Sequence, residues 1–151
     1  VLASILYGKA DLSLALNGAL AGLVSITAGP DVALPLQAII IGAVGGVLCT
    51  LAIPLLDKLK IDDVVGAISV HLVAGIWGTL VVGIPGLGTL AADFVTQLIG
   101  VVAIGVFVVV VSAITWLILK GVVGLRPTEE EEMSGLDVSE LGMEAYPEFR
   151  N

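Results

Sequence analysis

His71 is the residue whose chemistry contrasts most with its surroundings. It is the only histidine among the 151 residues, and it lies within a long stretch of apolar and small residues. An ionisable side chain at membrane depth is expensive and is usually directed at a cavity or a partner. A neutral imidazole carries one donor and one acceptor nitrogen, so it can hydrogen-bond a small polar solute or relay a proton. We therefore predict that His71 lines a path for such a solute.

The neighbours of His71 bear on this interpretation. A lone histidine is more often a hydrogen-bonded core residue, and that alternative applies here too. In an α-helix, the residues three, four and seven positions away share its side of the helix. That side would carry mostly small residues, which leave space beside the imidazole. These residues are Ala67, Ile68, Ala74, Gly75 and Gly78.

Other polar residues have simpler interpretations. The hydroxyl of Thr27 can hydrogen-bond the backbone of its own helix. Asp62 and Asp63 precede the apolar segment that carries His71, where a carboxylate can cap the positive end of a helix. The sequence has no phosphate-binding glycine loop with lysine, no metal-ligand spacing and no nucleophile–base pair. We expect no enzyme activity, cofactor, metal or nucleic-acid partner.

Composition places these residues in a membrane. The chain is 58% hydrophobic and 13% charged, with a mean hydropathy of +1.12, whereas soluble domains average about 25% charged residues. A membrane helix needs about 20 apolar residues, and long segments without alternating polarity indicate helices rather than strands. The sequence predicts an all-α, polytopic membrane helix bundle with four spanning helices, over residues 12–28, 34–56, 64–84 and 94–121. Residues 1–8 read as the end of a preceding helix, so we expect the chain to be part of a longer polypeptide.

The basic residues predict how the helices are oriented. All six lie in the first, third and fifth segments outside the predicted spans, and the segments around Asp31 and Asp93 have none. Because lysine and arginine favour cytoplasmic loops, these three segments should be cytoplasmic in a protein of the inner (plasma) membrane. The basic residues are Lys9, Lys58, Lys60, Lys120, Arg126 and Arg150.

The residues after the last apolar segment differ from the rest. The net charge of −8 belongs largely to them, since eight of the fourteen acidic residues follow Pro127. We divide the chain into a transmembrane domain, 1–121, and a cytoplasmic tail, 122–151. Acidic runs are commonly disordered, but interspersed apolar residues favour a short segment that docks on the cytoplasmic face. The eight are Glu129, Glu130, Glu131, Glu132, Asp137, Glu140, Glu144 and Glu148.

Two Gly-x-x-x-Gly pairs predict close helix packing. Gly18 and Gly22 lie in the first predicted helix, and Gly42 and Gly46 lie in the second. Small residues let helix backbones approach each other in lipid, where packing rather than the hydrophobic effect holds helices together. The motif is common and says nothing about function.

Three stretches of the sequence resemble the ammonium transporter family (Amt/Mep/Rh), in its bacterial Amt branch. The first is Leu16–Ala28, and the second runs from Pro54 to Asp63 and on through Gly66–Gly78. The third lies in the tail, at Gly135–Glu140 and Gly142–Tyr146. Together with the segments between them, they extend the resemblance over nearly the whole chain.

The resemblance implies a fold and a function. The family fold is a homotrimer in which each subunit has eleven transmembrane helices and its own narrow hydrophobic pore for ammonia. This chain would supply the last four helices and the regulatory tail, and alone it should not transport. The function implied is ammonium/ammonia transport across the inner membrane. The alternatives are an ammonium sensor and an accessory membrane subunit.

The resemblance also assigns residues. His71 matches the second of two pore histidines, Thr27 a position near the cytoplasmic side of the pore, and Asp63 the acidic residue that opens the histidine-bearing helix. The tail matches the segment that couples subunits and where PII-type signalling proteins dock. Pro127 and Leu141 depart from the family pattern there. The matching tail residues are Gly135, Leu136, Asp137, Glu140, Gly142 and Tyr146.

Overall fold

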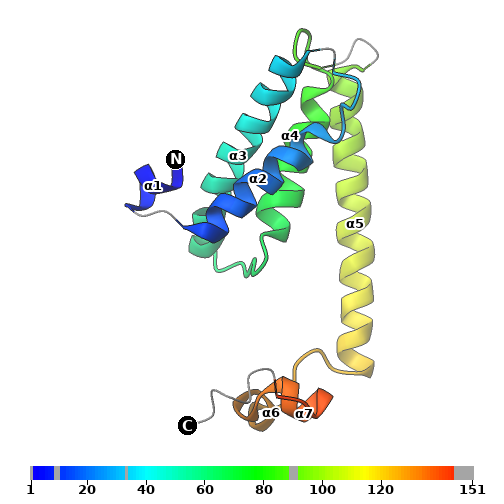
Figure 1. Ribbon diagram of the computed structural model, residues 1–151. Coiled ribbons are helices and arrows are strands. Elements are labelled where there is room, and N and C mark those ends of the chain that lie inside the picture. Colours follow the sequence, from blue (N-terminus) through cyan, green and yellow to red (C-terminus); the bar gives the residue numbers. More distant parts are fainter. Residues whose placement is uncertain (1, 9–10, 33, 89–91, 145–151) are drawn as a thin grey trace. The chain divides into compact units, whose positions relative to one another are not determined.

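The structure, a computed structural model, describes residues 2–8, 11–32, 34–88 and 92–144, and every regular element in these residues is helical (Figure 1). It divides into two compact units, 1–105 and 106–151, with the boundary inside α5. In chain order the elements are α1 (Leu2–Tyr7), α2 (Leu12–Ile26), α3 (Pro35–Lys58), η1 (Ala67–Val73), α4 (Ala74–Val81), α5 (Phe94–Val122), α6 (Glu129–Ser134) and α7 (Leu136–Leu141).

The backbones of α2 and α3 touch through the two glycine pairs. A Cβ atom added to Gly22 would lie 3.3 Å from the carbonyl oxygen of Gly42, and one added to Gly46 would lie 3.3 Å from that of Gly18. Gly18 therefore faces Gly46 and Gly22 faces Gly42, so the two helices are antiparallel. The close packing expected from the Gly-x-x-x-Gly pairs is confirmed.

The segment formed by η1 and α4 completes a three-helix bundle. It runs parallel to α2, because Gly66 contacts Asn17 while Gly78 contacts the backbone of Ser25. It runs antiparallel to α3, where the indole Nε1 of Trp77 donates a hydrogen bond to the carbonyl oxygen of Ile41 at 3.0 Å. The centre of the bundle is a cluster of small side chains, and these are Ala21, Cys49, Val70 and Ala74.

Local signals in the sequence set the helix ends. The carboxylate of Asp11 accepts a hydrogen bond from the Leu14 N–H at 2.9 Å and caps α2. Asp93 caps α5 by accepting from the backbone and the hydroxyl of Thr96 at 2.9 and 3.0 Å. Proline is tolerated in the first turn of a helix, and Pro35 begins α3. The helices thus begin close to the positions that the sequence predicts.

In the described part of the chain, two helices are long and apolar enough to cross a membrane, namely α3 with 24 residues and α5 with 29. The other two expected spans are shorter than predicted, since α2 has 15 residues and η1 with α4 covers Ala67–Val81. A 15-residue α-helix rises roughly 22 Å, whereas the hydrocarbon core of a bilayer is about 30 Å thick. Helix α2 ends at Ile26, ahead of Gly29 and Pro30, and the first residues after Asp63 form a turn rather than a helix.

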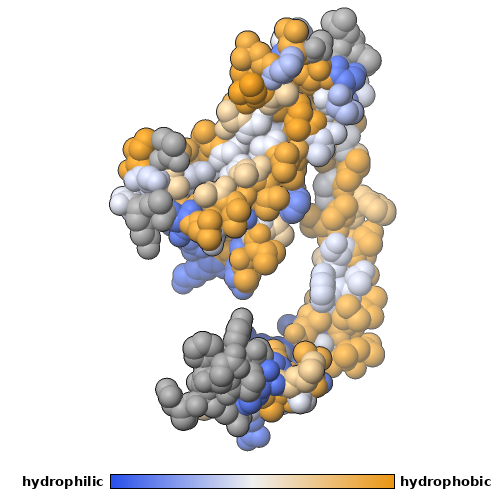
Figure 2. Space-filling model, in the orientation of Figure 1, coloured by the Kyte–Doolittle hydropathy of each residue, from blue (hydrophilic) through white to orange (hydrophobic). Residues whose placement is uncertain are grey.

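Apolar side chains cover much of the outer surface. No residue of α5 is buried within the described part of the chain, and Figure 2 shows hydrophobic side chains along this helix and on the bundle. A water-soluble protein rarely exposes so large a contiguous apolar surface. Lipid or other protein segments must therefore cover it.

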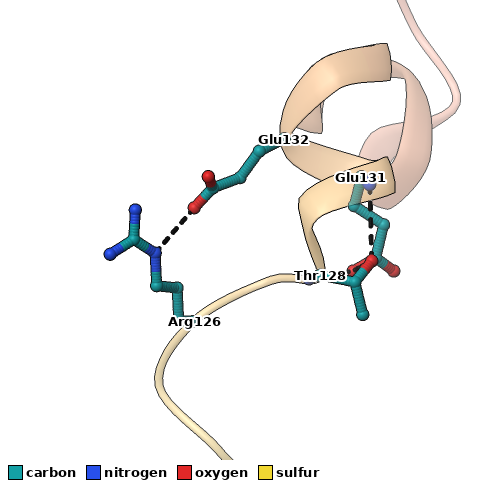
Figure 3. A network of polar contacts seen from close by, with 4 residues as sticks. All are labelled: Arg126, Thr128, Glu131 and Glu132. Atoms are coloured by element: carbon teal, nitrogen blue, oxygen red, sulfur yellow. Dashed lines mark hydrogen bonds and ion pairs between the residues drawn. The ribbon is translucent and has the colours of Figure 1, made fainter.

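The acidic tail forms two short helices, α6 and α7. Thr128 caps α6, because its hydroxyl accepts from the Glu131 N–H while its own backbone N–H donates to the Glu131 carboxylate at 2.8 Å (Figure 3). Arg126 and Glu132 form an ion pair at 2.8 Å beside this cap. The tail is therefore ordered over these turns.

The α2–α4 contact predicts the effect of a Gly78→Ala substitution. A Cβ at position 78 would overlap the backbone oxygen of Ser25, so the helices must separate. We expect the free energy of unfolding in detergent micelles to fall by about 1–3 kcal/mol, as overpacking typically costs. In α2, Gly18→Ala is the matched control, because its Cβ would meet nothing within 4 Å. Equal stability of the two variants would contradict the contact.

The α6 cap predicts a pH dependence for the tail. Hydrogen bonds from Thr128 lower the pKa of Glu131, and the Arg126 guanidinium lowers that of Glu132. A lowered pKa stabilises the fold above the ordinary glutamate value of about 4.3, and this contribution disappears as the pH falls through the folded pKa. The α6 amide signals in NMR spectra should therefore be constant from pH 8 to 5 and change below about pH 4. A change between pH 8 and 6 in wild type, absent from a Glu131→Gln variant, would contradict this.

Candidate functional site

His71 lies in the middle of η1, and its side chain is exposed. Within the described part of the chain its imidazole has no hydrogen-bond or ion-pair partner. The hydrogen-bonded core histidine considered as the alternative is therefore not what these residues build. The imidazole is open to a solute or to further protein.

The segment that carries His71 is a π-helix, not the α-helix expected over 64–84. Element η1 spans Ala67–Val73 and gives way to α4 at Ala74. Short π-helical turns are rare and often occur at functional sites. Hydrogen bonds in a π-helix skip one more residue than in an α-helix, a difference that hydrophobic periodicity does not reveal.

The residues before η1 explain its start. Gly66 has φ +76°, a left-handed conformation that suits glycine. The turn brings the carboxylate of Asp63 over the first residues of the helix. It accepts hydrogen bonds from the backbone N–H of Ile68 at 2.8 Å, the backbone N–H of Ser69 at 2.9 Å and the Ser69 hydroxyl at 2.9 Å. Of the two candidate caps, Asp63 is the one whose carboxylate makes these bonds, and Asp62 lies beside it in the turn.

These bonds also set the charge state of Asp63. Partial burial raises its pKa, but the hydrogen bonds from Ile68 and Ser69 together lower the pKa below the ordinary value. Hydrogen bonds donated to a carboxylate favour its charged form. Asp63 is thus a carboxylate at neutral pH and places negative charge at the positive end of the helix.

The face of the helix that bears His71 differs from the expected one. Ala74 and Gly78 are buried against α2, whereas His71 and Ala67 are exposed. Of the expected stripe, Ala67 is exposed as His71 is, but Ala74 and Gly78 are not, because the wide turn of a π-helix changes which residues align. The exposed face instead carries His71, Leu72 and Ile76.

Ser25 is a buried polar residue that the sequence interpretation did not single out. Its hydroxyl donates to the carbonyl oxygen of Ala21 at 2.7 Å and lies 3.4 Å from the carbonyl oxygen of Ala74, a second acceptor. Gly45 and Gly78 both face it, so three helices meet at this position. A serine near the end of an apolar helix, three residues after Gly22, was the available signal.

Thr27 does not join His71. Its hydroxyl donates to the carbonyl oxygen of Val24 at 2.6 Å, and the side chain is exposed at the end of α2. Its neighbour Gly29 packs against Val82, whereas Asn17 packs against Gly66 at the other end of the bundle. A cytoplasmic Lys58–Lys60 loop is therefore incompatible with Thr27 near the cytoplasmic side. The two predictions cannot both hold, because the order of the helices puts Thr27 and Lys58–Lys60 at opposite ends of the bundle.

The predicted tail residues lie in and beside α7. Gly135 separates α6 from α7 with φ +94°, and Gly142 ends α7 with φ +64°. Leu136, Asp137 and Glu140 are within α7. Tyr146 lies outside the described residues. The structure thus brings the described tail residues together around one short helix.

Comparison with known proteins identifies relatives of the chain. The model of the Ammonium Transporter Family matches residues 1–146. Ammonium transporter Amt1 of Haloferax mediterranei is 40% identical over 144 residues, which are 94% of this chain and 28% of that protein. Ammonium transporter Amt2 of Archaeoglobus fulgidus is 36% identical, over 94% of this chain and 34% of that protein. The chain therefore spans about a third of the length of these relatives.

A solved structure agrees with the fold. The chain resembles a structure titled Sensor Amt Protein with a TM-score of 0.82 and 33% identity, over 92% of this chain and 36% of that one. The named relatives are transporters of a membrane-protein family and not enzymes, in agreement with the prediction. The resemblance to ammonium transporters that the three sequence stretches carry is confirmed.

The turn before η1 predicts different effects for two adjacent aspartates. Asp63→Ala removes three hydrogen bonds at the helix start, so we expect the free energy of unfolding to fall by about 1–2 kcal/mol, as for other caps. Asp62→Ala is the matched control and should change it by less than about 0.5 kcal/mol. Unfolding of the chain in detergent micelles, followed by tryptophan fluorescence, measures both. Equal losses would contradict the assignment of the cap to Asp63.

Proposed function

The chain belongs to the ammonium transporter family, and we propose that it forms the His71-bearing part of a protein that moves ammonium or ammonia across the inner membrane. The observation that carries this proposal is the family match over residues 1–146, in which His71 is exposed on a π-helix. Because the chain spans about a third of its relatives, the rest of the path would come from other segments.

The chemistry of His71 suits ammonia better than ammonium. A bare cation in a low-dielectric path is costly to desolvate, whereas ammonia is neutral and still hydrogen-bonds. A neutral imidazole can accept a hydrogen bond from ammonia or donate one to it. Leu72 and Ile76, the other exposed side chains named on this face, cannot form hydrogen bonds. His71 would therefore hold and orient the solute.

The proposed arrangement in the membrane has four crossings. These are α2, α3, η1 with α4, and α5, as the last four helices of an eleven-helix fold. A short apolar helix can be accommodated by local thinning of the bilayer or by snorkelling of flanking residues. The Lys58–Lys60 loop and the tail would be cytoplasmic, because basic residues favour that side.

Assembly and regulation complete the proposal. The protein would be a homotrimer, and a PII-type signalling protein would bind its cytoplasmic face. The tail residues around α7 would take part in that regulation: Gly135, Leu136, Asp137, Glu140, Gly142 and Tyr146. The two glycines with positive φ give the tail its sharp turns, which support a defined path for it.

A second candidate function is ammonium sensing. One observation favours it, namely the likeness to the structure titled Sensor Amt Protein. A sensor needs an ammonium site but no continuous path, so binding without uptake would distinguish it. An accessory membrane subunit would show neither.

Replacement of His71 tests the proposed role. In a protein completed with the missing helices of a relative, His71→Ala should abolish methylammonium uptake or change its selectivity, because the solute loses its hydrogen-bonding partner. Leu72→Ala is the matched control, since Leu72 is exposed on the same turn and offers no hydrogen bond. Uptake into membrane vesicles measures both variants. Unchanged uptake and selectivity in His71→Ala would refute the role of His71.

A further inference from the structure

We propose that Ser69 is a positioning residue for His71. Its buried hydroxyl, bound to the Asp63 carboxylate, holds η1 in the π-helical register that exposes the imidazole. The effect on transport rests on the proposed function, whereas the effect on the position of His71 does not. Ser69 lies two residues before His71, within the same π-helix.

The Ser69 side chain is fixed by polar contacts in a place where water has no access. Ser69 has 0% relative exposure. Both its backbone N–H and its hydroxyl donate to the same oxygen of Asp63 at 2.9 Å. A hydroxyl buried in this way costs free energy unless it is hydrogen-bonded. The Asp63–Ser69 pair is therefore a defined contact and not an incidental one.

The surrounding helices hold this pair from two sides. Asn17 of α2 packs on Gly66, the residue from which η1 starts. The Cys49 thiol of α3 is near Ser69 and donates to the carbonyl oxygen of Asn17 at 3.8 Å. Val70, the next residue, is also buried. The beginning of η1 is thus fixed against both neighbouring helices.

The end of η1 is fixed as well. Ala74 has 0% relative exposure, and the Ser25 hydroxyl approaches its carbonyl oxygen. One turn later, Gly78 allows the α4 backbone to touch that of α2. Between the two fixed points lie Val70–Val73, the four residues that include His71. With both ends held, these residues keep the wide turn, and His71 faces outward.

Loss of the hydroxyl should let this turn change. In an α-helix each residue advances about 100° around the axis, so a shift in register by one residue turns a side chain by that amount. Without the Ser69–Asp63 contact, the beginning of η1 can rewind as an α-helix. His71 would then rotate away from the exposed face.

The single histidine makes the position of His71 directly measurable. In the ¹³C–¹H NMR spectrum of the chain in detergent micelles, the imidazole Cε1–Hε1 group gives one signal, which needs no assignment. We expect Ser69→Ala to shift this signal and change its broadening by a water-soluble gadolinium chelate. Thr79→Ala is the matched control, because the Thr79 hydroxyl donates to its own helix at Gly75, and this variant should leave both unchanged. An unshifted signal in folded Ser69→Ala would overturn the proposal.

A second variant covers the case in which Ser69→Ala does not fold. Ser69→Cys keeps a weak donor of similar shape, so we expect its His71 signal to lie near that of wild type. A shift no larger than that in Thr79→Ala supports the proposal. If Ser69→Cys folds but moves the signal far from that of wild type, the hydroxyl geometry alone does not set the position, and the proposal fails.

Uptake by the completed protein separates the two claims. Loss of uptake in His71→Ala with normal uptake in Ser69→Ala would retain the proposed function and refute the positioning role.

Discussion

The close approach of α2 to α3 and α4 is the constraint on which the rest of the bundle depends. Helices in lipid gain little from the hydrophobic effect on association, so backbone contact through small residues must hold them together. Gly22 and Gly42 provide that contact between α2 and α3, and Gly78 provides it between α2 and α4. The core of small residues is tightly packed, since Ala21 and Ala74 are fully buried. The position of α2 therefore fixes where η1 begins and ends.

This packing connects the core to the candidate site. Because both ends of η1 are held, the wide turn lies in the residues between them, and one of these is His71. The Asp63 carboxylate stabilises that turn through three hydrogen bonds. Among the described residues, His71 has no hydrogen-bond partner of its own, and the turn exposes its side chain. That combination suits a residue that must offer both ring nitrogens to a passing solute.

The sequence predicted some of these features and could not predict others. Apolar length and glycine spacing indicated the helices and their close packing, because both are local patterns. The π-helix was missed because it depends on a turn and on the contact between Asp63 and Ser69, which only the folded chain brings together. Ser25 was missed for a similar reason, since its burial depends on glycines of two other helices. The path beside His71 stays a prediction, because other segments of the relatives would form its other side.

We propose that this chain supplies part of an ammonium path and not a complete one. The most direct test is methylammonium uptake by membrane vesicles that contain either this chain or the chain joined to the preceding helices of a relative. Correct insertion is checked in both. We predict uptake by the joined protein alone. Uptake by neither form, despite correct insertion and binding of ammonium, would contradict transport and favour a sensor.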